Sequence, residues 1–368
     1  MNILLYYQNP YHTVFLESLV QGFIKKGHTV FFLTTCEEGV LHEKMKSFGA
    51  KVETNVAEGG TFTFYRAQVK FLIRFCRKHD IDIVYAHLQT ANLVAAFARP
   101  FIRAEVFPCR HHADDVSMRE NQNAIRQDKL VNRLSKKIVV VSNAVKQHMV
   151  KHELVDPAKI EVIPLGYNFD LYDQPDELIV KKIRGQMQCR LLLILIGRMN
   201  RNKNHIAALE VLNKLVVENY DVKMIIMDDG PEKATIQKYI SDHGLSEKIL
   251  FTGFMSNTMD HIAAADLLVH PSLSEASNQV VKEAALLRKP SIVCNEVGDF
   301  AEYIVNGKNG FTVSKNDIVN EMCLVIRELY QHQDRLEAAG QAIHNEVKKR
   351  FAIEPVCDAY LALSKNSK

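Results

Sequence analysis

The residues best suited to chemistry lie directly after the apolar runs of the second half of the chain. The run Leu191–Ile196 is followed by Gly197, Arg198 and Lys203, just before a predicted helix. Glycine lets the backbone come close to a ligand, and cations near a helix N-terminus form a site for an anion. Arginine can bind a phosphate through two hydrogen bonds, whereas lysine supplies a point charge. A solvated basic turn explains this motif equally well when it is taken alone.

Two carboxylates follow the apolar run Leu267–His270. Glu275 lies in the predicted loop, and Glu283 lies near the start of the next predicted helix, with seven residues between them. A carboxylate can accept hydrogen bonds from two neighbouring sugar hydroxyls, so the pair suits a hydroxyl-rich ligand. The alternative is a glutamate stabilised by the helix dipole together with an ordinary surface glutamate. The spacing alone favours this alternative.

A third group, Asp228-Asp229-Gly230, follows the run 223–227. Two adjacent aspartates suggest a metal–nucleotide site, but no third acidic ligand lies near them in the sequence. Asp-Gly-Pro before a helix is typical of turn and capping chemistry. We therefore interpret the aspartates as a turn and keep Gly230 as a point where a ligand can approach the backbone.

Short apolar runs alternate with longer amphipathic segments along almost the whole chain. Continuous apolar character is typical of strands that are covered on both faces of a parallel sheet. Two such series predict an α/β fold with two doubly wound, Rossmann-like domains, residues 1–173 and 174–350, that face each other across a cleft. The predicted strands are Asn2–Tyr7, Thr29–Leu33, Ile81–Tyr85, Ala104–Cys109, Ile138–Val141 and Ile160–Ile163 in the first domain, and Leu191–Ile196, Lys223–Met227, Ile249–Phe251, Leu267–His270 and Pro290–Cys294 in the second.

The composition is that of a globular protein, since 47% of the 368 residues are apolar and 24% are charged. The net charge of +3 is too small for a nucleic-acid coat, so we expect no nucleic-acid partner. The basic excess belongs to residues 1–173, which hold 22 basic and 18 acidic side chains. Seven scattered cysteines without a CxxC pair indicate neither a disulfide framework nor a structural zinc site. Without a signal-peptide pattern or a long apolar stretch, we expect a cytoplasmic protein.

The motifs of the second half occur in one order at close spacing. They are GRMNRNK (197–203), MDDGPE (227–232), FTGF (251–254), AAADLLVHPSLSE (263–275), KEAALLRKPSIV (282–293) and NGKNGFTV (306–313). This succession resembles the C-terminal half of the retaining glycosyltransferases of family 4, which have the two-domain GT-B fold. The first half is similar more weakly, through DIVYAH (82–87), the histidine pair at 111–112, VVVSNAVKQHM (139–149) and IEVIPLGYN (160–168).

The resemblance implies a role for each matching residue of the second half. Arg198 and Lys203 would hold the nucleotide diphosphate and stabilise the leaving phosphate. Glu275 would lie beside the donor sugar, and Glu283 would bind the nucleotide ribose. Further donor contacts are expected at Gly197, Gly230, Ser277, Asn278 and Gln279.

In the first half, the resemblance points to His111 as the histidine that faces the donor sugar, with His112 as the other candidate. It also implies that a C-terminal helix within residues 351–368 crosses back to the first domain. The activity implied is a retaining, metal-independent transfer of a sugar from a nucleotide diphosphate sugar to a hydroxyl of a glycan or lipid-linked acceptor. No cofactor is expected, and cell-surface polysaccharide assembly is the favoured setting.

Four segments depart from the family pattern. The loop after the first strand, residues 8–12, lacks the usual glycine pair, so its acceptor contacts are in doubt. Residues 276–278 replace a Gly-Phe-Gly loop, which predicts a different selectivity for sugar hydroxyls. Lys289 stands where a glycine is expected, and Gly298-Asp299 replaces a glycine pair.

Residues 62–78 form a further pattern, with basic side chains at i, i+4 and i+8 and no acidic residue. A basic amphipathic helix can lie on an anionic membrane, here the inner face, although a surface helix with its apolar side in the core explains the pattern equally well. His148, His152 and His205 have no partner pattern and are expected at the surface.

Three other classes of protein are weighed against the transferase. A sugar-nucleotide epimerase or hydrolase of the same fold would need no acceptor, and a purely binding protein would have lost its chemistry. A dinucleotide-dependent oxidoreductase is disfavoured because GxGxxG is absent after the strands that would carry it.

Overall fold

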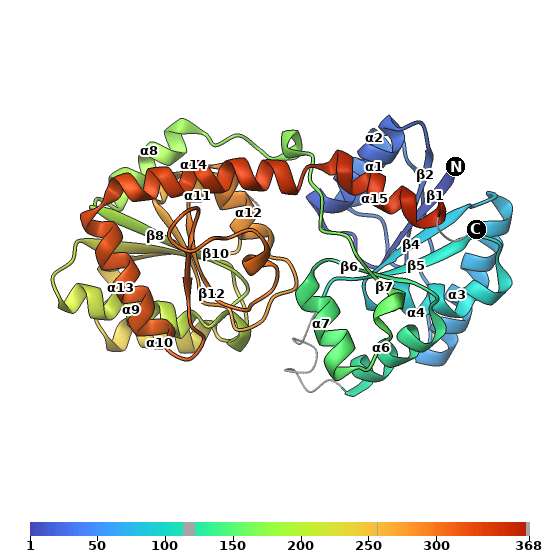
Figure 1. The fold of residues 1–368 in the computed structure, drawn as a ribbon, viewed down its shortest axis with the longest axis horizontal. Coiled ribbons are helices and arrows are strands. Elements are labelled where there is room, and N and C mark those ends of the chain that lie inside the picture. The colour runs from blue at the N-terminus through green and yellow to red at the C-terminus, as the bar shows by residue number, and fades with distance from the viewer. Residues whose placement is uncertain (113–121, 256, 366–368) are drawn as a thin grey trace. The chain divides into compact units, whose positions relative to one another are not determined.

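The computed structural model describes residues 1–112, 122–255 and 257–365. The chain divides into two compact units (Figure 1). The first unit contains Met1–Leu171 together with the C-terminal segment from Phe351 onward. The second unit contains Tyr172–Arg350.

The first unit is built on a parallel sheet of seven strands in the order β3-β2-β1-β4-β5-β6-β7. Its order reverses between β1 and β4, which is the switch point of a doubly wound sheet. The strands are β1 (Asn2–Tyr7), β2 (Thr29–Thr34), β3 (Lys51–Thr54), β4 (Ile83–His87), β5 (Glu105–Arg110), β6 (Ile138–Val140) and β7 (Ile160–Val162).

Helices cover both faces of this sheet. Helix α4 packs between α3 and α6, while α1 packs against α2 and α15 (Figure 1). The bounds are α1 (Val14–Lys25), α2 (Val40–Ser47), α3 (Thr61–Lys78), α4 (Gln89–Ala98), α6 (Gln122–Leu134), α7 (Asn143–His152) and α15 (Ile353–Lys365). Residues 366–368 of the predicted C-terminal segment lie outside the described residues.

The second unit has a parallel sheet of six strands in the order β10-β9-β8-β11-β12-β13. Its strands are β8 (Leu191–Ile196), β9 (Val222–Met227), β10 (Ile249–Gly253), β11 (Leu267–His270), β12 (Ser291–Cys294) and β13 (Phe311–Val313). Every residue of β8 is buried, which explains its continuous apolar sequence.

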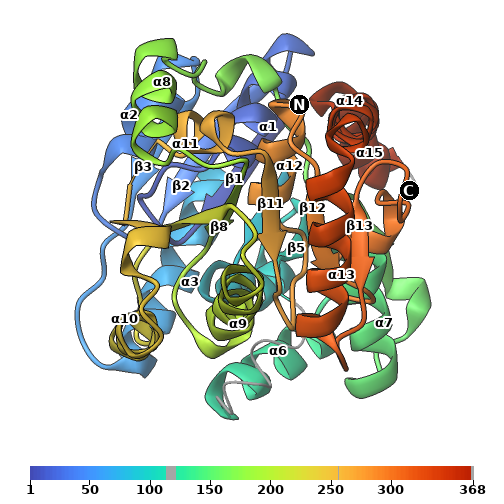
Figure 2. The same ribbon diagram turned by 90° about the vertical axis from the view of Figure 1, so that its left-hand side faces the viewer.

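Two helix layers cover the second sheet (Figure 2). Helix α9 contacts α10 and α13 in one layer, and α11 contacts α8 and α12 in the other, where α12 also packs on α14. The bounds are α8 (Glu177–Gln186), α9 (His205–Val217), α10 (Lys233–Asp242), α11 (Met259–Ala264), α12 (Gln279–Leu286), α13 (Ile318–Gln331) and α14 (Gln333–Arg350).

The predicted α/β class and its two doubly wound sheets are confirmed, with differences at the sheet edges. Strands β3 and β13 are absent from the sequence prediction because β3 is polar (KVET) and β13 has only three residues. Strand β4 begins at Ile83 rather than Ile81, since Asp82 precedes the buried run and its carboxylate accepts a hydrogen bond from the backbone of Asn2.

All seven cysteines are free. Over the ranges that the structure describes, no helix combines the length and the apolar character needed to cross a bilayer.

Candidate active site

The basic turn after β8 lies at the edge of the sheet where the neighbouring parallel strands also end. Gly197 has a φ of +156°, and the methylenes of Lys203 lie against its Cα, where a Cβ would be 3.4 Å from Lys203 Cδ. The turn ends in a 3-10 helix, η4 (Arg201–Lys203), whose N-cap is Asn200. Asn200 Oδ1 accepts a hydrogen bond from Lys203 N at 3.1 Å. Arg198 is exposed at the same turn.

Glu275 follows β11 and meets this turn directly. Its carboxylate is paired with the ammonium group of Lys203, and its Oε1 lies 2.8 Å from Nε2 of His270. Burial alone would raise the pKa of Glu275, but the hydrogen bond from His270 and the nearby charge of Lys203 together hold it well below its ordinary value. Glu275 is therefore a carboxylate at every physiological pH.

Two buried histidines lie beneath this ion pair. His270 is the last residue of β11, and burial lowers its pKa although Glu275 opposes the shift. His205 begins α9 and is also buried, where desolvation lowers its pKa to about 4. The prediction that His205 lies at the surface is therefore wrong, because the first residue of α9 is covered by the basic turn and by β11. Both rings are neutral near pH 7, which leaves Lys203 as the cation facing Glu275.

A second set of hydrogen bonds fixes the loop that carries Glu275 to the basic turn. Asn202 Nδ2 donates to the carbonyl oxygen of Ser274 at 2.8 Å, and Leu273 N donates to the carbonyl oxygen of Asn202 at 2.9 Å. The two loops therefore form one surface, although Lys203 and Glu275 are 72 positions apart in the sequence.

Glu283 lies one turn inside α12 and is buried. Its carboxylate accepts hydrogen bonds from Gln279 Nε2 at 2.7 Å and from Thr258 Oγ1 at 3.2 Å. Asn278 is the N-cap of α12, with its Oδ1 accepting from Val281 N at 3.1 Å. The side chains of Asn278 and Gln279 thus orient the helix and Glu283.

The turn after β9 holds Gly230 against the basic turn. A Cβ at Gly230 would lie 2.5 Å from the carbonyl oxygen of Met199, so only glycine fits there. Asp228 Oδ1 accepts from Asp229 N, and Asp229 accepts from Gly230 N and from Lys233 Nζ, each at 2.7 Å. These bonds agree with the interpretation of the aspartates as a turn. Among the described residues, no group of three or more His, Cys, Asp or Glu side chains is arranged to hold a metal ion.

The histidine pair of the first unit lies after β5. His111 Nε2 is 2.9 Å from Nδ1 of His87, and burial lowers the pKa of His111 to about 4, with a smaller contribution from His112. His112 Nε2 lies 2.7 Å from Asp128 Oδ2, and Gln89 donates to the other oxygen of that carboxylate at 3.2 Å. The two histidines therefore differ in kind: His111 is a neutral ring against His87, and His112 is a ring oriented by a carboxylate.

The structure thus brings Gly197, Lys203 and Glu275 together in the second unit, with Gly230 against Met199 of the basic turn. The sequence analysis did not identify His270 as a site residue. His270 is the last residue of β11, as His87 is of β4, and this shared position at the end of a strand could have identified it. It also missed Asn202, Lys282 and Asp299, whose contacts depend on the folded arrangement of loops distant in sequence.

Comparison with known proteins agrees with this arrangement. The family model described as "Glycosyl transferases group 1" matches residues 181–346, and the model described as "Glycosyltransferase Family 4" matches residues 13–171. The two matches follow one another and lie in the second and first units respectively. The chain belongs to glycosyltransferase family 4.

Relatives of this family-4 glycosyltransferase are distant but extensive. The N-acetyl-alpha-D-glucosaminyl L-malate synthase of Bacillus anthracis is 23% identical over 301 residues, which are 79% of this chain and 77% of the relative. An Escherichia coli enzyme named UDP-Gal:alpha-D-GlcNAc-diphosphoundecaprenol alpha-1,3-galactosyltransferase is 24% identical over 270 residues, 70% of this chain and 68% of the relative. The Anabaena protein HepE, solved in complex with UDP, has a TM-score of 0.83 at 19% identity over the full length of both chains.

These comparisons decide between two of the classes weighed from the sequence. HepE shows that the fold is GT-B, and the relatives are named as a synthase and a transferase. The protein is therefore a glycosyltransferase, and an epimerase or hydrolase of the same fold is not favoured.

Proposed function

We propose that this glycosyltransferase moves a sugar from a nucleotide diphosphate sugar to a hydroxyl of a lipid-linked or glycan acceptor, with retention of anomeric configuration. The observation that carries the proposal is the joined surface of the basic turn and the Glu275 loop. It offers cations for phosphate and a carboxylate for sugar hydroxyls side by side. The Escherichia coli relative is named for a UDP-sugar donor, and HepE was solved with UDP, so a uridine nucleotide is the first donor to test.

In this proposal the donor diphosphate replaces Glu275 as the partner of Lys203. The ammonium group and the exposed guanidinium of Arg198 would neutralise charge that develops on the leaving phosphate as the glycosidic bond breaks. The proton of the acceptor hydroxyl would pass to the leaving phosphate oxygen on the same face of the sugar. No metal is needed for this charge balance, because the two cations supply it.

Glu275, once released from Lys203, would accept hydrogen bonds from the donor sugar while His270 keeps it oriented at 2.8 Å. Glu283 would receive the ribose, exchanging one of its present donors, Gln279 or Thr258, for ribose hydroxyls. Each carboxylate thus has a neutral hydrogen-bond partner that stays in place when the ligand binds, which limits the cost of ordering it. From the first unit, His111 remains the proposed sugar-facing histidine.

The acceptor is proposed to be lipid-linked and reached from the inner face of a membrane. Two relatives, from Escherichia coli and Campylobacter jejuni, are named for acceptors joined to a diphosphoundecaprenol or diphospho-undecaprenol lipid. The protein would then work in the cytoplasm, in the assembly of a cell-surface polysaccharide or glycolipid.

Helix α3 is the proposed membrane-facing surface. Its apolar side, with Leu72 and Phe75, packs into the core of the first unit. The opposite side carries a stripe of exposed side chains that are spaced four positions apart. The stripe begins at Phe62, whose exposed fraction is 79%. A basic stripe headed by an exposed aromatic ring suits an anionic bilayer, at about 1 kcal/mol for each cation near the surface. The cations of the stripe are Arg66, Lys70, Arg74 and Lys78.

Sedimentation with vesicles of phosphatidylglycerol and phosphatidylcholine tests this surface. The K70E/R74E variant should bind at least about 30-fold more weakly than the wild type, because two favourable charges are lost. The control K348E/K349E makes the same charge change on α14 and should bind like the wild type. Equal losses in both variants would mean that only net charge matters, and the surface proposal would fail.

Thermal unfolding with a panel of nucleotide diphosphate sugars tests the donor class. A bound donor raises the unfolding temperature by mass action, so one sugar nucleotide should stabilise the protein more than its free sugar does. Incubation of that donor without acceptor should yield little product, because transfer needs an acceptor hydroxyl. Complete turnover of the donor alone would instead identify a hydrolase or epimerase.

A further inference from the structure

Lys282 is a lysine whose side chain is entirely buried in the second unit. It lies in α12 with an exposed fraction of 0%, although a buried ammonium group is costly unless it is fully paired. Its Nζ donates to Asp299 Oδ2 at 2.8 Å, to Ser277 Oγ at 2.9 Å and to the carbonyl oxygen of Asn278 at 3.0 Å. An ammonium group has three hydrogens, and these three acceptors use them all.

The contacts of Lys282 determine what Ser277 can offer to a ligand. Ser277 Oγ donates its single hydrogen to Asp299 Oδ2 at 2.6 Å and accepts from Lys282. A hydroxyl has one hydrogen and two lone pairs, so one lone pair remains and no hydrogen does. Ser277 is half-buried and lies two residues after Glu275. It can therefore accept a hydrogen bond from a ligand but cannot donate one.

Asp299 is also in contact with the Glu275 loop through its neighbour. Gly298 has a φ of +56°, and a Cβ there would lie 2.8 Å from Cβ of Glu275. The two departures from the family pattern, at 276–278 and at Gly298-Asp299, thus meet at a single buried ion pair.

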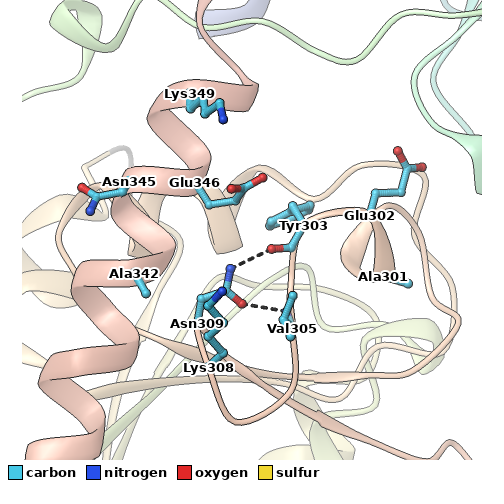
Figure 3. Close-up of a pocket in the computed structure, with 10 residues that line it drawn as sticks. All are labelled: Ala301, Glu302, Tyr303, Val305, Lys308, Asn309, Ala342, Asn345, Glu346 and Lys349. Carbon is cyan, nitrogen blue, oxygen red and sulfur yellow. Dashed lines mark hydrogen bonds between the residues drawn. The ribbon is translucent and has the colours of Figure 1, made fainter.

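The remaining side of Lys282 is closed by Tyr303. The ammonium group lies 5.2 Å from the centre of the Tyr303 ring. Figure 3 shows Tyr303 among the residues that line a pocket of about 340 Å³ beside α14, where Asn309 locks its backbone. Asn309 Nδ2 donates to the carbonyl oxygen of Tyr303 at 2.9 Å, and Asn309 Oδ1 accepts from Val305 N at 2.7 Å. Tyr303 is thus held in place beside the Lys282 ammonium group.

We propose that Lys282 and Asp299 are positioning residues for donor recognition, which turn the hydroxyl hydrogen of Ser277 away from the ligand. Ser277 Oγ then serves as a hydrogen-bond acceptor for the donor sugar. Such a group favours a sugar hydroxyl at this point and disfavours a carbonyl or a carboxylate. This inference rests on the proposed function, since it assigns the Glu275 loop to the donor sugar. The nucleotide part of the donor is proposed to bind at the basic turn, so its affinity should not depend on the Lys282–Asp299 pair.

The experiment compares binding of UDP with binding of UDP-glucose, UDP-galactose and UDP-N-acetylglucosamine by calorimetry. Ser277→Ala keeps the ion pair but removes one of the three acceptors of the Lys282 ammonium group, so its thermal unfolding is measured beside its binding. It should lose about tenfold in affinity for the preferred UDP-sugar, with UDP affinity changed less than twofold. The K282M/D299N variant removes both charges at similar volume and should show the same sugar-specific loss. Ser241→Ala, an exposed serine on α10, is the control and should bind like the wild type.

Four results would overturn the inference. Unchanged UDP-sugar affinity in Ser277→Ala would show that Ser277 does not contact the sugar. Parallel losses for UDP and UDP-sugar in K282M/D299N would show that the pair only stabilises the fold. If the wild type bound UDP but no UDP-sugar, the loop would not be a sugar site, whereas binding of neither would overturn the proposed donor itself and this inference with it.

Discussion

At the scale of single residues, the proposed mechanism depends most on Lys203. Its ammonium group is paired with Glu275 in the ligand-free structure, and a donor diphosphate is proposed to take the place of that carboxylate. The Glu275 carboxylate thus holds the Lys203 ammonium group at the site until the more highly charged diphosphate binds. This exchange links the donor sugar and the donor phosphate, because the release of Glu275 and the capture of phosphate are one event.

The first prediction concerns the two cations of the basic turn. Lys203→Ala and Arg198→Ala should each lower kcat/KM by at least about 100-fold, because each removes charge that stabilises the leaving phosphate. Steady-state release of the nucleotide diphosphate measures the effect. Arg201→Ala is the matched control, an exposed cation of the same turn, and should keep near wild-type activity. Full activity of Lys203→Ala would contradict the assigned role.

The second prediction concerns Glu275. Glu275→Ala should cost more in kcat than in donor affinity, since the carboxylate is proposed to act on the sugar while the diphosphate remains bound by cations. The affinity for the free nucleotide diphosphate is expected to rise, because Lys203 no longer pairs with the Glu275 carboxylate. Calorimetry with UDP and steady-state kinetics measure the two effects separately. A large loss of UDP affinity would be inconsistent with the proposed exchange.

The third prediction is a pH dependence of stability. Burial lowers the pKa of His111 and of His205 to about 4, below the ordinary value of 6.5, so the unfolded chain binds more protons between these values. The free energy of unfolding should therefore fall as the pH drops from 6.5 towards 4, by about 1.4 kcal/mol per pH unit for each histidine. Glu275 has a lowered pKa and acts in the same direction only below about its ordinary value of 4.5.

Urea unfolding at pH 7, 6 and 5 measures this slope. His205→Gln should reduce the slope by about one proton, and His152→Gln, which changes an exposed histidine on α7, should leave it unchanged. A wild-type stability that is flat between pH 7 and pH 5 would contradict the assignment of neutral buried rings.

Much of the site could be predicted at this scale because the rule that ligands gather after parallel strands needs only the sequence. Gly197, Lys203 and Glu275 were found in this way and lie together. The pairing of Lys282 with Asp299 could not be found, because a lysine in the first turn of a helix is normally solvated. Nothing local marks it as buried, and its partner comes from a loop beyond the next strand.

At the scale of elements, the second unit depends on close packing of α14 behind α12. Gly340 faces the turn after α12, where a Cβ would lie 2.1 Å from the carbonyl oxygen of Arg288. The glycine is thus required by packing rather than by its backbone conformation. Gly185 is its counterpart on α8, where a Cβ would meet no atom within 4 Å.

The fourth prediction uses these two glycines as a matched pair. Gly340→Ala should destabilise the protein by more than about 2 kcal/mol, because rigid backbone must move. Gly185→Ala should stabilise it by up to about 1 kcal/mol, since alanine is the better helix former and has room. Denaturant unfolding measures both, and equal effects of the two variants would contradict the packing described for α14.

The elements themselves could be predicted where the apolar run is long and continuous, as in β8 and β9. The polar strand β3 could not, because its place in the sheet comes from backbone pairing with β2 and its side chains are at most half-buried. The stripe on α3 could be predicted as a helix face from its spacing, and the structure adds that its apolar side belongs to the core.

At the scale of the whole molecule, helix α15 belongs to the same unit as β1 and α1. Tyr360 of α15 is fully buried against Phe23 and Tyr85, with ring centres 6.3 and 4.9 Å apart, and Tyr85 Oη donates to its carbonyl oxygen at 2.6 Å. Gly22 of α1 allows this contact, since a Cβ there would lie 2.4 Å from Sγ of Cys357. The last helix is therefore part of the core of the first unit.

The fifth prediction follows from this packing. Tyr360→Ala should destabilise the first unit by about 3–5 kcal/mol through loss of a buried ring, although residue 360 comes after the whole second unit in sequence. Hydrogen exchange should speed up in α1 and β4 but not in β8 or β9. Tyr360→Phe keeps the ring and should change little. Faster exchange confined to the second unit would contradict the assignment of α15.

The most direct test of the central claim follows a labelled sugar from donor to acceptor. The wild type is incubated with a UDP-sugar labelled in the sugar and with a membrane lipid extract, and the label in the lipid fraction is compared with the nucleotide released. We expect equal amounts of lipid-linked label and UDP, both lost in Lys203→Ala and kept in Arg201→Ala. Release of UDP with the label left as free sugar, or transfer that survives Lys203→Ala, would contradict this expectation.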